Sequence, residues 1–327
     1  MGMLIVRFLD GDKTRWGRLV GAAPSSPTER LEVVPFEGSL RTTSDLIQAF
    51  ERGELRSDSR GAVTVEAAQL RSPITSDATV ICQGLNYQDH AAEAQHHTRK
   101  ENLFFAKASS TISGAYDAIV RPKAVELLDY EVEFGVVMRK PLDRELAPGQ
   151  VDLGSYVAGV VLANDVSARD VMFGAPFLQW FQGKSYRTFC PLGPVLYLLE
   201  KGEVATVLSN LEIKLWVNGE LRQSAKSSQL IYGPLETLGQ LSGVLDLQVG
   251  DVILTGTPGG VTSPASPKLV EILKTKLMAD DQRKQELRAE MTKGRPFLQP
   301  GDVLRSSFHD LHADLFLGGQ ESRIVAG

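Results

Sequence analysis

Residues 128–137 read LDYEVEFGVV, in which the acids Asp129, Glu131 and Glu133 occupy every second position. Successive side chains of a β-strand point to opposite faces. The alternation therefore predicts a strand with its acids on one face and apolar side chains on the other. Such a pattern is also that of any half-exposed antiparallel strand, so the strand alone does not establish a site.

A second carboxylate strengthens the case for a site. Asp165 ends the apolar run YVAGVVLAN, which predicts a buried strand. A carboxylate there costs several kcal/mol unless it is paired or bound to a metal. Carboxylates from two strands, with no histidine among them, suit a hard cation such as Mg²⁺ or Mn²⁺. We therefore expect a metal site built by these two segments.

The pattern along the rest of the chain favours an α+β fold that is mainly β, because strands predominate and no regular βαβ repeat emerges. A hairpin is expected at 3–9 and 15–20, a helix at 43–52 and a domain boundary near 73. We therefore divide the chain into a small N-terminal α+β domain, 1–75, and a larger domain, 76–327. Further strands are expected at 78–84, 102–106, 131–138, 157–164, 194–199, 210–217, 251–255, 302–308 and 313–317. Helices are expected after Tyr87, near 229–242 and, as one longer helix, near 267–292 within a charged helical insertion at 264–296.

Composition restricts the class of protein. The 327 residues carry a net charge of −5, which argues against a nucleic-acid partner. The longest apolar stretch is far shorter than the ~20 residues that span a bilayer. The two cysteines, Cys82 and Cys190, form no CxxC pattern, which indicates a reducing compartment. The N-terminus lacks the pattern of a secretory signal. We expect a cytoplasmic protein with no membrane or nucleic-acid partner.

Other side chains could take part in catalysis. His90 and Glu93 are neighbours if DHAAE forms a helical turn, and a carboxylate beside an imidazole favours general-base chemistry, although a surface contact would look the same. Arg169 could bind a substrate carboxylate or simply neutralise Asp165 or Asp170. Lys184 could face a developing oxyanion, or only extend its stem along apolar surface.

Two nucleotide-binding patterns are missing. GKS at 183–185 has Leu178 where a P-loop requires its first glycine, and no GxGxxG precedes a helix. The turn TGTPGGV, 255–261, instead allows close backbone approach and offers the N–H and hydroxyl of Thr257.

Taken together, six segments resemble the fumarylacetoacetate hydrolase (FAH) superfamily. They are GLNYQDHAAE (84–93), FAKASSTISG (105–114), DYEVEF (129–134), NDVSARD (164–170), GKSYRTFCPLGP (183–194) and TGTPGGV (255–261). The resemblance implies a mixed β-roll catalytic domain, preceded by a small N-terminal domain, and a homodimer.

The resemblance also implies roles for individual residues. Glu131, Glu133 and Asp165 match the ligands of Mg²⁺ or Mn²⁺, and Asp129 matches no ligand. His90 and Glu93 match a water-activating pair, and Lys184 matches a catalytic lysine. The substrate contacts implied are Lys107, Arg169 and Thr257. Met172 departs from the family, which usually has Gln there, so a polar contact would be absent or supplied by Gln179 or Gln182.

The implied activity is metal-dependent hydrolysis of a carbon–carbon bond in a 2,4-dioxo acid or acylpyruvate, in catabolism of aromatic or related compounds. Decarboxylation, hydration of a 2-oxo-enoate and tautomerisation remain alternatives, because each needs the same chelate and one proton-transfer group. A non-catalytic metal- and ligand-binding protein is a further alternative, supported only by Met172.

Overall fold

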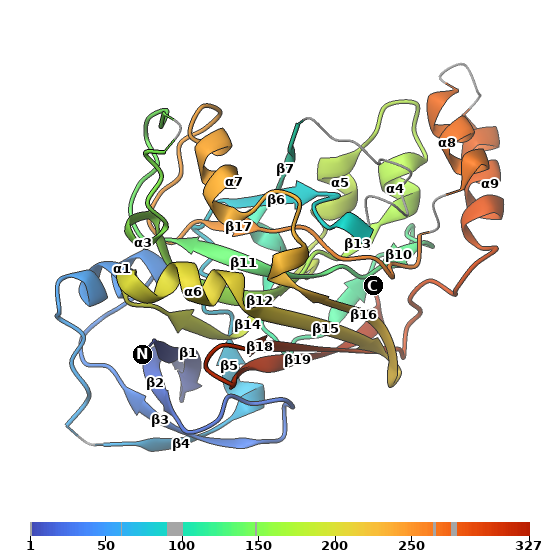
Figure 1. Cartoon of the computed structure of the whole chain (residues 1–327). Helices are drawn as coiled ribbons and strands as arrows, with labels where there is room; N and C mark the ends of the chain where they lie inside the picture. Colours follow the sequence, from blue (N-terminus) through green and yellow to red (C-terminus); the bar gives the residue numbers. More distant parts are fainter. Residues whose placement is uncertain (1, 60, 90–100, 148, 264–265, 276–279) are drawn as a thin grey trace.

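The computed structural model describes residues 2–59, 61–89, 101–147, 149–263, 266–275 and 280–327. Within them the fold is mainly β, with short helices placed around two large sheets (Figure 1). No helix of the described residues is long and apolar enough to cross a membrane.

The larger sheet has 12 strands and follows the order β4-β3-β2-β1-β14-β12-β11-β17-β6-β7, with β5 beside β1 and β8 beside β14. Most neighbours are antiparallel, but β17 is parallel to β6 and β8 is parallel to β14, so the sheet is mixed. Its strands are β1 (Met3–Asp10), β2 (Lys13–Val20), β3 (Arg30–Pro35), β4 (Val63–Glu66), β5 (Leu70–Arg71), β6 (Val80–Gly84), β7 (Leu103–Lys107), β8 (Ile112–Ser113), β11 (Val132–Met138), β12 (Val157–Asn164), β14 (Cys190–Leu198) and β17 (Val252–Leu254).

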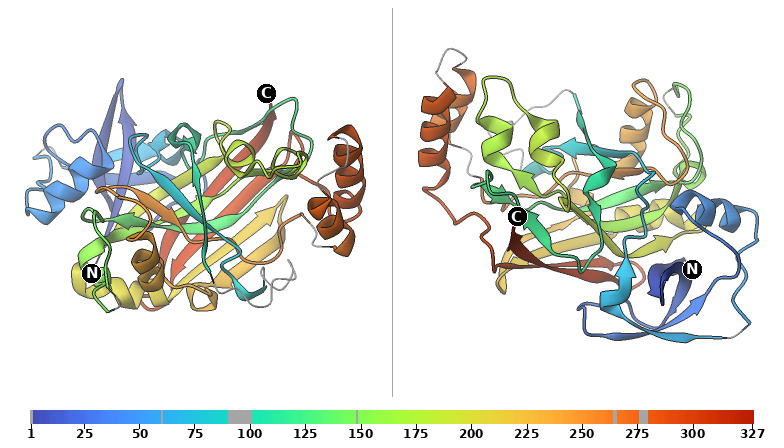
Figure 2. Two further views of the ribbon diagram at one scale, coloured as in Figure 1. Left: turned by 90° about the horizontal axis from the view of Figure 1, so that it is seen from above. Right: turned by 180° about the vertical axis from the view of Figure 1, so that it is seen from behind.

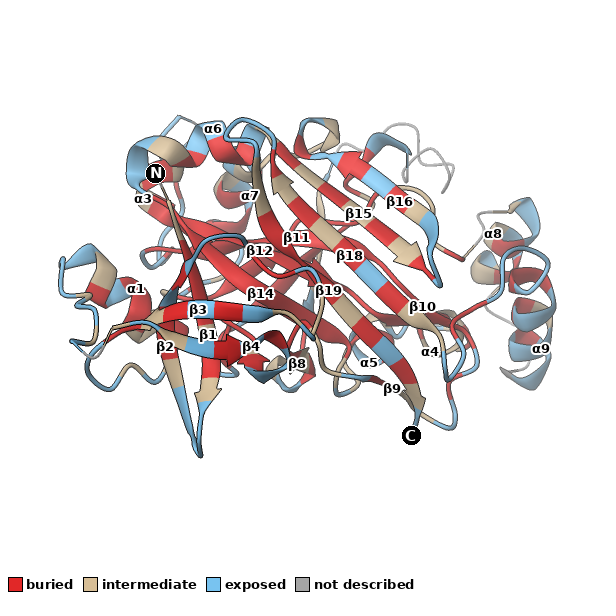
Figure 3. Cartoon of the chain, turned by 90° about the horizontal axis from the view of Figure 1, so that it is seen from below, coloured by how far each residue is buried: buried red, intermediate tan, exposed pale blue. Residues whose placement is uncertain are grey.

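The second sheet has five strands in the order β16-β15-β18-β19-β9. They are β9 (Ile119–Arg121), β15 (Leu211–Val217), β16 (Glu220–Lys226), β18 (Val303–Asp310) and β19 (Leu315–Ala326). Buried and part-exposed positions alternate along β15, as expected for a sheet with one covered face (Figure 3). The rings of Phe134 on β11 and Phe308 on β18 stack with their centroids 6.2 Å apart, which joins the two sheets through the main core.

Short elements complete the fold. The two-stranded ladder of β10 (Leu128–Asp129) and β13 (Ser167–Ala168) lies beside α4 and α5 at one end of the large sheet (Figure 1). The helices are α1 (Thr43–Glu51), α3 (Leu153–Tyr156), α4 (Arg169–Phe173), α5 (Trp180–Lys184), α6 (Val204–Ser209), α7 (Pro234–Leu241), α8 (Pro267–Lys274) and α9 (Asp280–Met291).

The expected fold class is confirmed, and two expected elements need correction. The single helix expected near 267–292 is two helices, α8 and α9, which lie side by side at the edge of the molecule (Figure 2). The last strand runs to Ala326, well beyond the expected 317, because its C-terminal part pairs with β9. Most of the helix expected after Tyr87 lies outside the described residues.

The N-terminal hairpin is joined to the rest of the large sheet. Met3, Leu4 and Ile5 of β1 pair with Leu198, Tyr197 and Leu196 of β14. The sheet therefore continues across the expected boundary near residue 73, and the division into domains at 75 stays a prediction.

Candidate metal and active site

The acidic strand and the strand that follows it meet where the large sheet ends. Val132 pairs with Asn164 across β11 and β12, and the N–H of Asp165 donates to the carbonyl of Glu131 at 2.8 Å. The side chain of Asn164 accepts from the N–H of Glu131 at 3.0 Å, which fixes the turn just before β11. This backbone pairing brings three carboxylates from two segments to one place.

Glu131, Glu133 and Asp165 each offer an oxygen within 4.8 Å of those of the other two. The exposed fractions are 6% for Glu131 and 0% for Glu133 and Asp165. The alternating neighbours Tyr130 and Val132 belong to the main core on the opposite face, as the period of two predicts. Three buried carboxylates this close repel one another strongly unless cations balance them.

Two lysines supply part of that balance. The Nζ of Lys184 lies 2.7 Å from Glu131 Oε2 and 2.6 Å from Asp165 Oδ2. The Nζ of Lys107 lies 2.5 Å from Asp165 Oδ1, and both lysine side chains are buried. Burial alone would lower the pKa of Lys184, but the carboxylates of Asp165 and Glu131 outweigh it and raise that pKa. Lys184 is therefore held as an ammonium ion.

Arg169 supplies a third cation. Its NH2 lies 2.6 Å from Glu131 Oε1, and its Nε donates to Asp129 Oδ2 at 2.9 Å. Asp129 is fully buried and also accepts from the N–H groups of Thr262 and Ser263, at 2.9 and 3.1 Å. Among its described contacts, Arg169 therefore neutralises neither Asp165 nor Asp170, the two acidic partners that the sequence suggested. It links Asp129 to Glu131 and orients the latter.

The contacts of Glu133 indicate whether a metal cation would fit this site. Its Oε2 accepts from the N–H of Gly256 at 2.7 Å, but its buried Oε1 has no hydrogen-bond partner among the described residues. Burial raises the pKa of Glu133 well above its usual value, and the charges of Asp165 and Glu131 add to this. With Glu133 ionised, the four carboxylates of Asp129, Glu131, Glu133 and Asp165 meet only three cations, which leaves one negative charge uncompensated. A hard divalent cation held by oxygens of these three acids fits both features.

Thr257 lies beside the acidic strand, but its hydroxyl is already engaged. The Oγ1 donates to the carbonyl of Val132 at 2.9 Å and accepts from Nε2 of Gln223 at 2.8 Å. Gln223, from β16, also accepts from the N–H of Val132 at 2.9 Å and donates to the carbonyl of Pro258 at 2.8 Å. Gln223 therefore positions the TGTPGG turn against β11. Nothing in the segment ELRQSAK distinguishes this glutamine in the sequence.

Met172 is buried beside Lys184. It is 1% exposed, and its Cγ lies 2.2 Å from where a Cβ on Gly183 would stand, so the glycine permits this close packing. Gln179 and Gln182 are exposed and line a surface pocket with Lys284 of α9. The structure therefore shows neither glutamine in contact with the carboxylates. His90 and Glu93 lie outside the described residues.

A family model described as fumarylacetoacetate (FAA) hydrolase C-terminal matches residues 79–320. The chain belongs to this family. The match includes both acidic segments and every described residue that contacts them.

Curated members of the family share about two fifths of the aligned residues. A mitochondrial oxaloacetate tautomerase of Bos taurus is 42% identical over 190 residues, which are 58% of this chain and 59% of that protein. One from Rattus norvegicus is 38% identical over 234 residues, covering 69% of this chain and 72% of that protein. The chain thus spans less than two thirds of the bovine relative.

Solved structures show the same fold over the whole chain. Fumarylacetoacetate hydrolase from Exiguobacterium antarcticum has a TM-score of 0.71 at 27% identity, covering 99% of this chain and 100% of that chain. A 2-hydroxyhepta-2,4-diene-1,7-dioate isomerase from Mycobacterium marinum has a TM-score of 0.67 at 22% identity, covering 99% and 98%. The second likeness concerns the fold alone.

Proposed function

We propose that the protein is a metal-dependent tautomerase that interconverts the keto and enol forms of a small 2-oxo dicarboxylate of the oxaloacetate type. The observation that carries the proposal is the buried group of Glu131, Glu133 and Asp165, with the ammonium of Lys184 bonded to two of them. The named activity of the relatives at 38–42% identity supports tautomerisation rather than another reaction of the family.

Glu131, Glu133 and Asp165 would hold Mg²⁺ or Mn²⁺. When bound, such an ion supplies Lewis-acid polarisation of the oxygens of a 2-oxo acid. Arg169 keeps the carboxylate of Glu131 in place, and Lys107 does the same for Asp165. Because these contacts exist before substrate arrives, little reorganisation is needed during the reaction.

Proton transfer requires groups at two positions. Lys184, held as an ammonium, donates a hydrogen bond to the substrate oxygen that gains negative charge when the C3 proton leaves. We propose His90, oriented by Glu93, as the base that removes the C3 proton when the enol forms and returns it to C3 in the reverse direction. The enol oxygen takes its proton from the ammonium of Lys184, and the proton held by His90 then returns to Lys184 through water. The hydroxyl of Thr257 is engaged by Val132 and Gln223, so a substrate carboxylate at this end would meet the backbone N–H of Thr257.

Hydrolysis of a carbon–carbon bond in an acylpyruvate is the second candidate. The likeness to fumarylacetoacetate hydrolase at 27% identity over the whole chain favours it. The same His90–Glu93 pair would then deprotonate a water molecule, and Lys184 would stabilise the tetrahedral oxyanion. Decarboxylation and hydration of a 2-oxo-enoate need the same groups and have less support from the relatives.

A substrate panel separates these candidates. With Mg²⁺ present, we expect faster decay of the enol absorbance of oxaloacetate, with no loss of total oxaloacetate. Acylpyruvate cleavage without any effect on that interconversion would establish hydrolysis instead, and loss of total oxaloacetate would establish decarboxylation. Binding of oxalate with no turnover of any substrate would indicate a non-catalytic protein.

The oligomeric state and the cellular compartment are two further proposals. We expect a homodimer, to be tested by light scattering after gel filtration. The two cysteines are free and buried, as expected in a reducing cytoplasm. The mammalian relatives are named as mitochondrial, so immunoblotting of fractionated cells would test the cytoplasmic expectation.

A further inference from the structure

A pocket of about 420 Å³ lies away from the acidic site, where the N-terminal strands meet the rest of the large sheet. It is formed by β1, β5, β8, the start of α1 and residues 72–77, the segment that leads towards β6. Three arginines line it: Arg7, Arg41 and Arg71. None of them makes an ion pair with a described residue; Arg71 donates only to the carbonyls of Ala68 and Leu70.

Two of these arginines are held directly opposite each other. Arg7 of β1 and Arg71 of β5 are register partners in the antiparallel ladder. Like charges in such positions destabilise a sheet. Burial lowers the pKa of Arg7, and the charge of Arg71 lowers it further. The fold therefore keeps a repulsive pair of guanidinium groups at the pocket.

Two buried polar atoms at the pocket also have no partner. The Oγ of Ser113 forms no hydrogen bond within the described part of the chain, although Ser113 is only 9% exposed. The Nε of Arg7 is likewise buried without an acceptor, while its NH1 donates to the carbonyl of Ser72 at 3.3 Å. Donors left unsatisfied at a cationic pocket indicate an acceptor that is not part of this chain.

Two acids, Asp77 and Asp117, line the same pocket and could balance the charge of the arginines. Asp117 accepts from the N–H of Gly114 at 2.6 Å, and Asp77 lies close enough to affect the charge of Arg7. Neither forms an ion pair with the three arginines among the described residues. The lining therefore keeps one positive charge in excess, with its guanidinium donors uncommitted to carboxylates.

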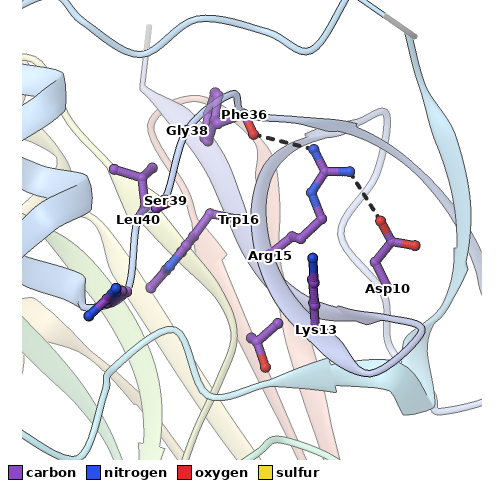
Figure 4. Close-up of a pocket in the computed structure, with 10 residues that line it drawn as sticks. Asp10, Lys13, Arg15, Trp16, Phe36, Gly38, Ser39 and Leu40 are labelled. Carbon is purple, nitrogen blue, oxygen red and sulfur yellow. Dashed lines mark hydrogen bonds and ion pairs between the residues drawn. The ribbon is translucent and has the colours of Figure 1, made fainter.

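A neighbouring pocket of about 600 Å³ contains an arginine, Arg15, whose charge is balanced within the chain (Figure 4). There Arg15 lies 3.1 Å from Asp10 and 2.8 Å from Asp58, and it also donates to the carbonyl of Phe36. Arg15 is thus neutralised by the chain itself, whereas Arg41, which lines both pockets, forms no ion pair with a described residue. This contrast with Arg15 makes Arg7 and Arg71 of the smaller pocket the better candidates for binding a ligand.

We propose that the pocket lined by Arg7, Arg71 and Ser113 binds a small oxyanion, the phosphate group or a carboxylate group of a metabolite. Guanidinium forks recognise the oxygens of either group by paired hydrogen bonds. This site would be separate from the acidic site and does not depend on the proposed tautomerase activity. It is connected to that site through the chain, because Lys107, which ends β7 and contacts Asp165, precedes Ser113 at the end of β8 by only a short segment.

The test is calorimetric titration of metal-stripped full-length protein with inorganic phosphate and, separately, with succinate. Stripping the metal keeps either anion from binding through a cation at the acidic site. We expect at least one of them to bind with one site per chain, and the tighter anion identifies the group that is recognised. Arg71→Gln should weaken binding at least about tenfold, or about 1.4 kcal/mol. Arg30→Gln, an exposed arginine on β3 that does not line the pocket, should bind as the wild type does.

A second variant keeps the test informative if Arg71→Gln folds poorly. Ser113→Ala removes a hydroxyl that has no partner in the described structure, so its melting temperature should match the wild type. Its anion affinity should still fall about fivefold, as expected for one lost hydrogen bond. The proposal is overturned if neither anion binds the wild type, or if both variants bind as tightly as Arg30→Gln.

Discussion

Lys184 is the residue on which the charge balance of the acidic site depends most. Its ammonium lies within 2.7 Å of both Glu131 and Asp165, and its side chain is 1% exposed. Removing one partner of a buried ion pair leaves an uncompensated charge, which costs far more than the net value of the pair.

We therefore expect Lys184→Met to lower the stability of the metal-free protein by about 3–5 kcal/mol in urea denaturation. Turnover should fall about 10²–10³-fold, since an oxyanion donor is lost. Lys214→Met is the matched control, because Lys214 pairs with Glu212 at the surface and such pairs contribute about 1 kcal/mol or less. Equal stability losses in the two variants would contradict the role given to Lys184.

Met172 gives a second prediction for a single residue. It is buried and packed on Gly183, and no described side chain is shown to offer its position a hydrogen bond. Met172→Gln, the residue usual in the family, should lower the free energy of unfolding by about 1–3 kcal/mol. Met172→Leu should cost less than about 1.5 kcal/mol, because it conserves volume and apolar character. A glutamine variant as stable as the wild type would show that a polar partner exists.

Sequence reasoning placed the acids together and named Lys107, Arg169 and Lys184 as site residues, but it did not pair them with particular carboxylates. A strand period of two predicts that Glu131 and Glu133 share a face without knowledge of the fold. The contacts of Lys107 and Arg169 with specific carboxylates depend on how distant segments meet. The side chain of Gln223 joins β16 to β11 and to the TGTPGG turn by three hydrogen bonds, to Val132, Thr257 and Pro258. No local sequence pattern marks this glutamine.

At the scale of elements, α8 and α9 form a helical pair with a small core of its own. That core contains Leu269, Leu287 and Met291, together with Leu127 and Phe297 from outside the pair. Arg283 of α9 is 1% exposed and donates to the carbonyls of Ile272 and Thr275, which are free at the C-terminus of α8. This arginine fastens the two helices together.

Arg283→Met should loosen the pair, because two carbonyls at the end of α8 lose a charged donor. We expect local opening to become easier by about 1.5–3 kcal/mol, measured as faster amide hydrogen exchange in α8 and α9. Lys284→Met, an exposed neighbour on the same helix, should leave exchange unchanged. If exchange accelerates equally in both variants, Arg283 is not the residue that holds the pair.

The helical pattern of this insertion was visible in the sequence, but its division into two helices, α8 and α9, was not. Leu269, Ile272 and Leu273 lie at helical spacing and predicted the first helix well. The helix ends at Lys274, where Arg283 of the second helix satisfies the carbonyls of Ile272 and Thr275. Periodicity in the sequence cannot relate these residues to one another. The predicted bounds of the strands at 157–164 and 211–217 agree more closely with the structure, because long apolar or alternating runs determine these strands locally.

At the scale of the whole molecule, one sheet runs from the N-terminal strands to β7. Ile5 and Trp16 from the N-terminal strands lie in the same buried cluster as Cys82, Val137 and Cys190, so part of the core is shared across residue 73. The sequence could not show this continuity, because the pairing of β1 with β14 joins segments almost 200 residues apart.

A shared core predicts that the chain unfolds as one unit. Phe8, 1% exposed, packs in the main core, and Phe8→Ala should lower stability by about 3–5 kcal/mol. Calorimetry should show one transition that shifts as a whole. A separate early transition that alone responds to this substitution would indicate an independent N-terminal domain.

The central claim is that Glu131, Glu133 and Asp165 together hold one divalent cation. Calorimetric titration of metal-stripped protein with Mn²⁺ tests it most directly. The account predicts one ion per chain, with affinity reduced at least about 100-fold in Glu133→Gln and unchanged in Glu32→Gln, whose side chain is exposed on β3. Failure of the wild type to bind, or wild-type affinity in Glu133→Gln, would contradict it.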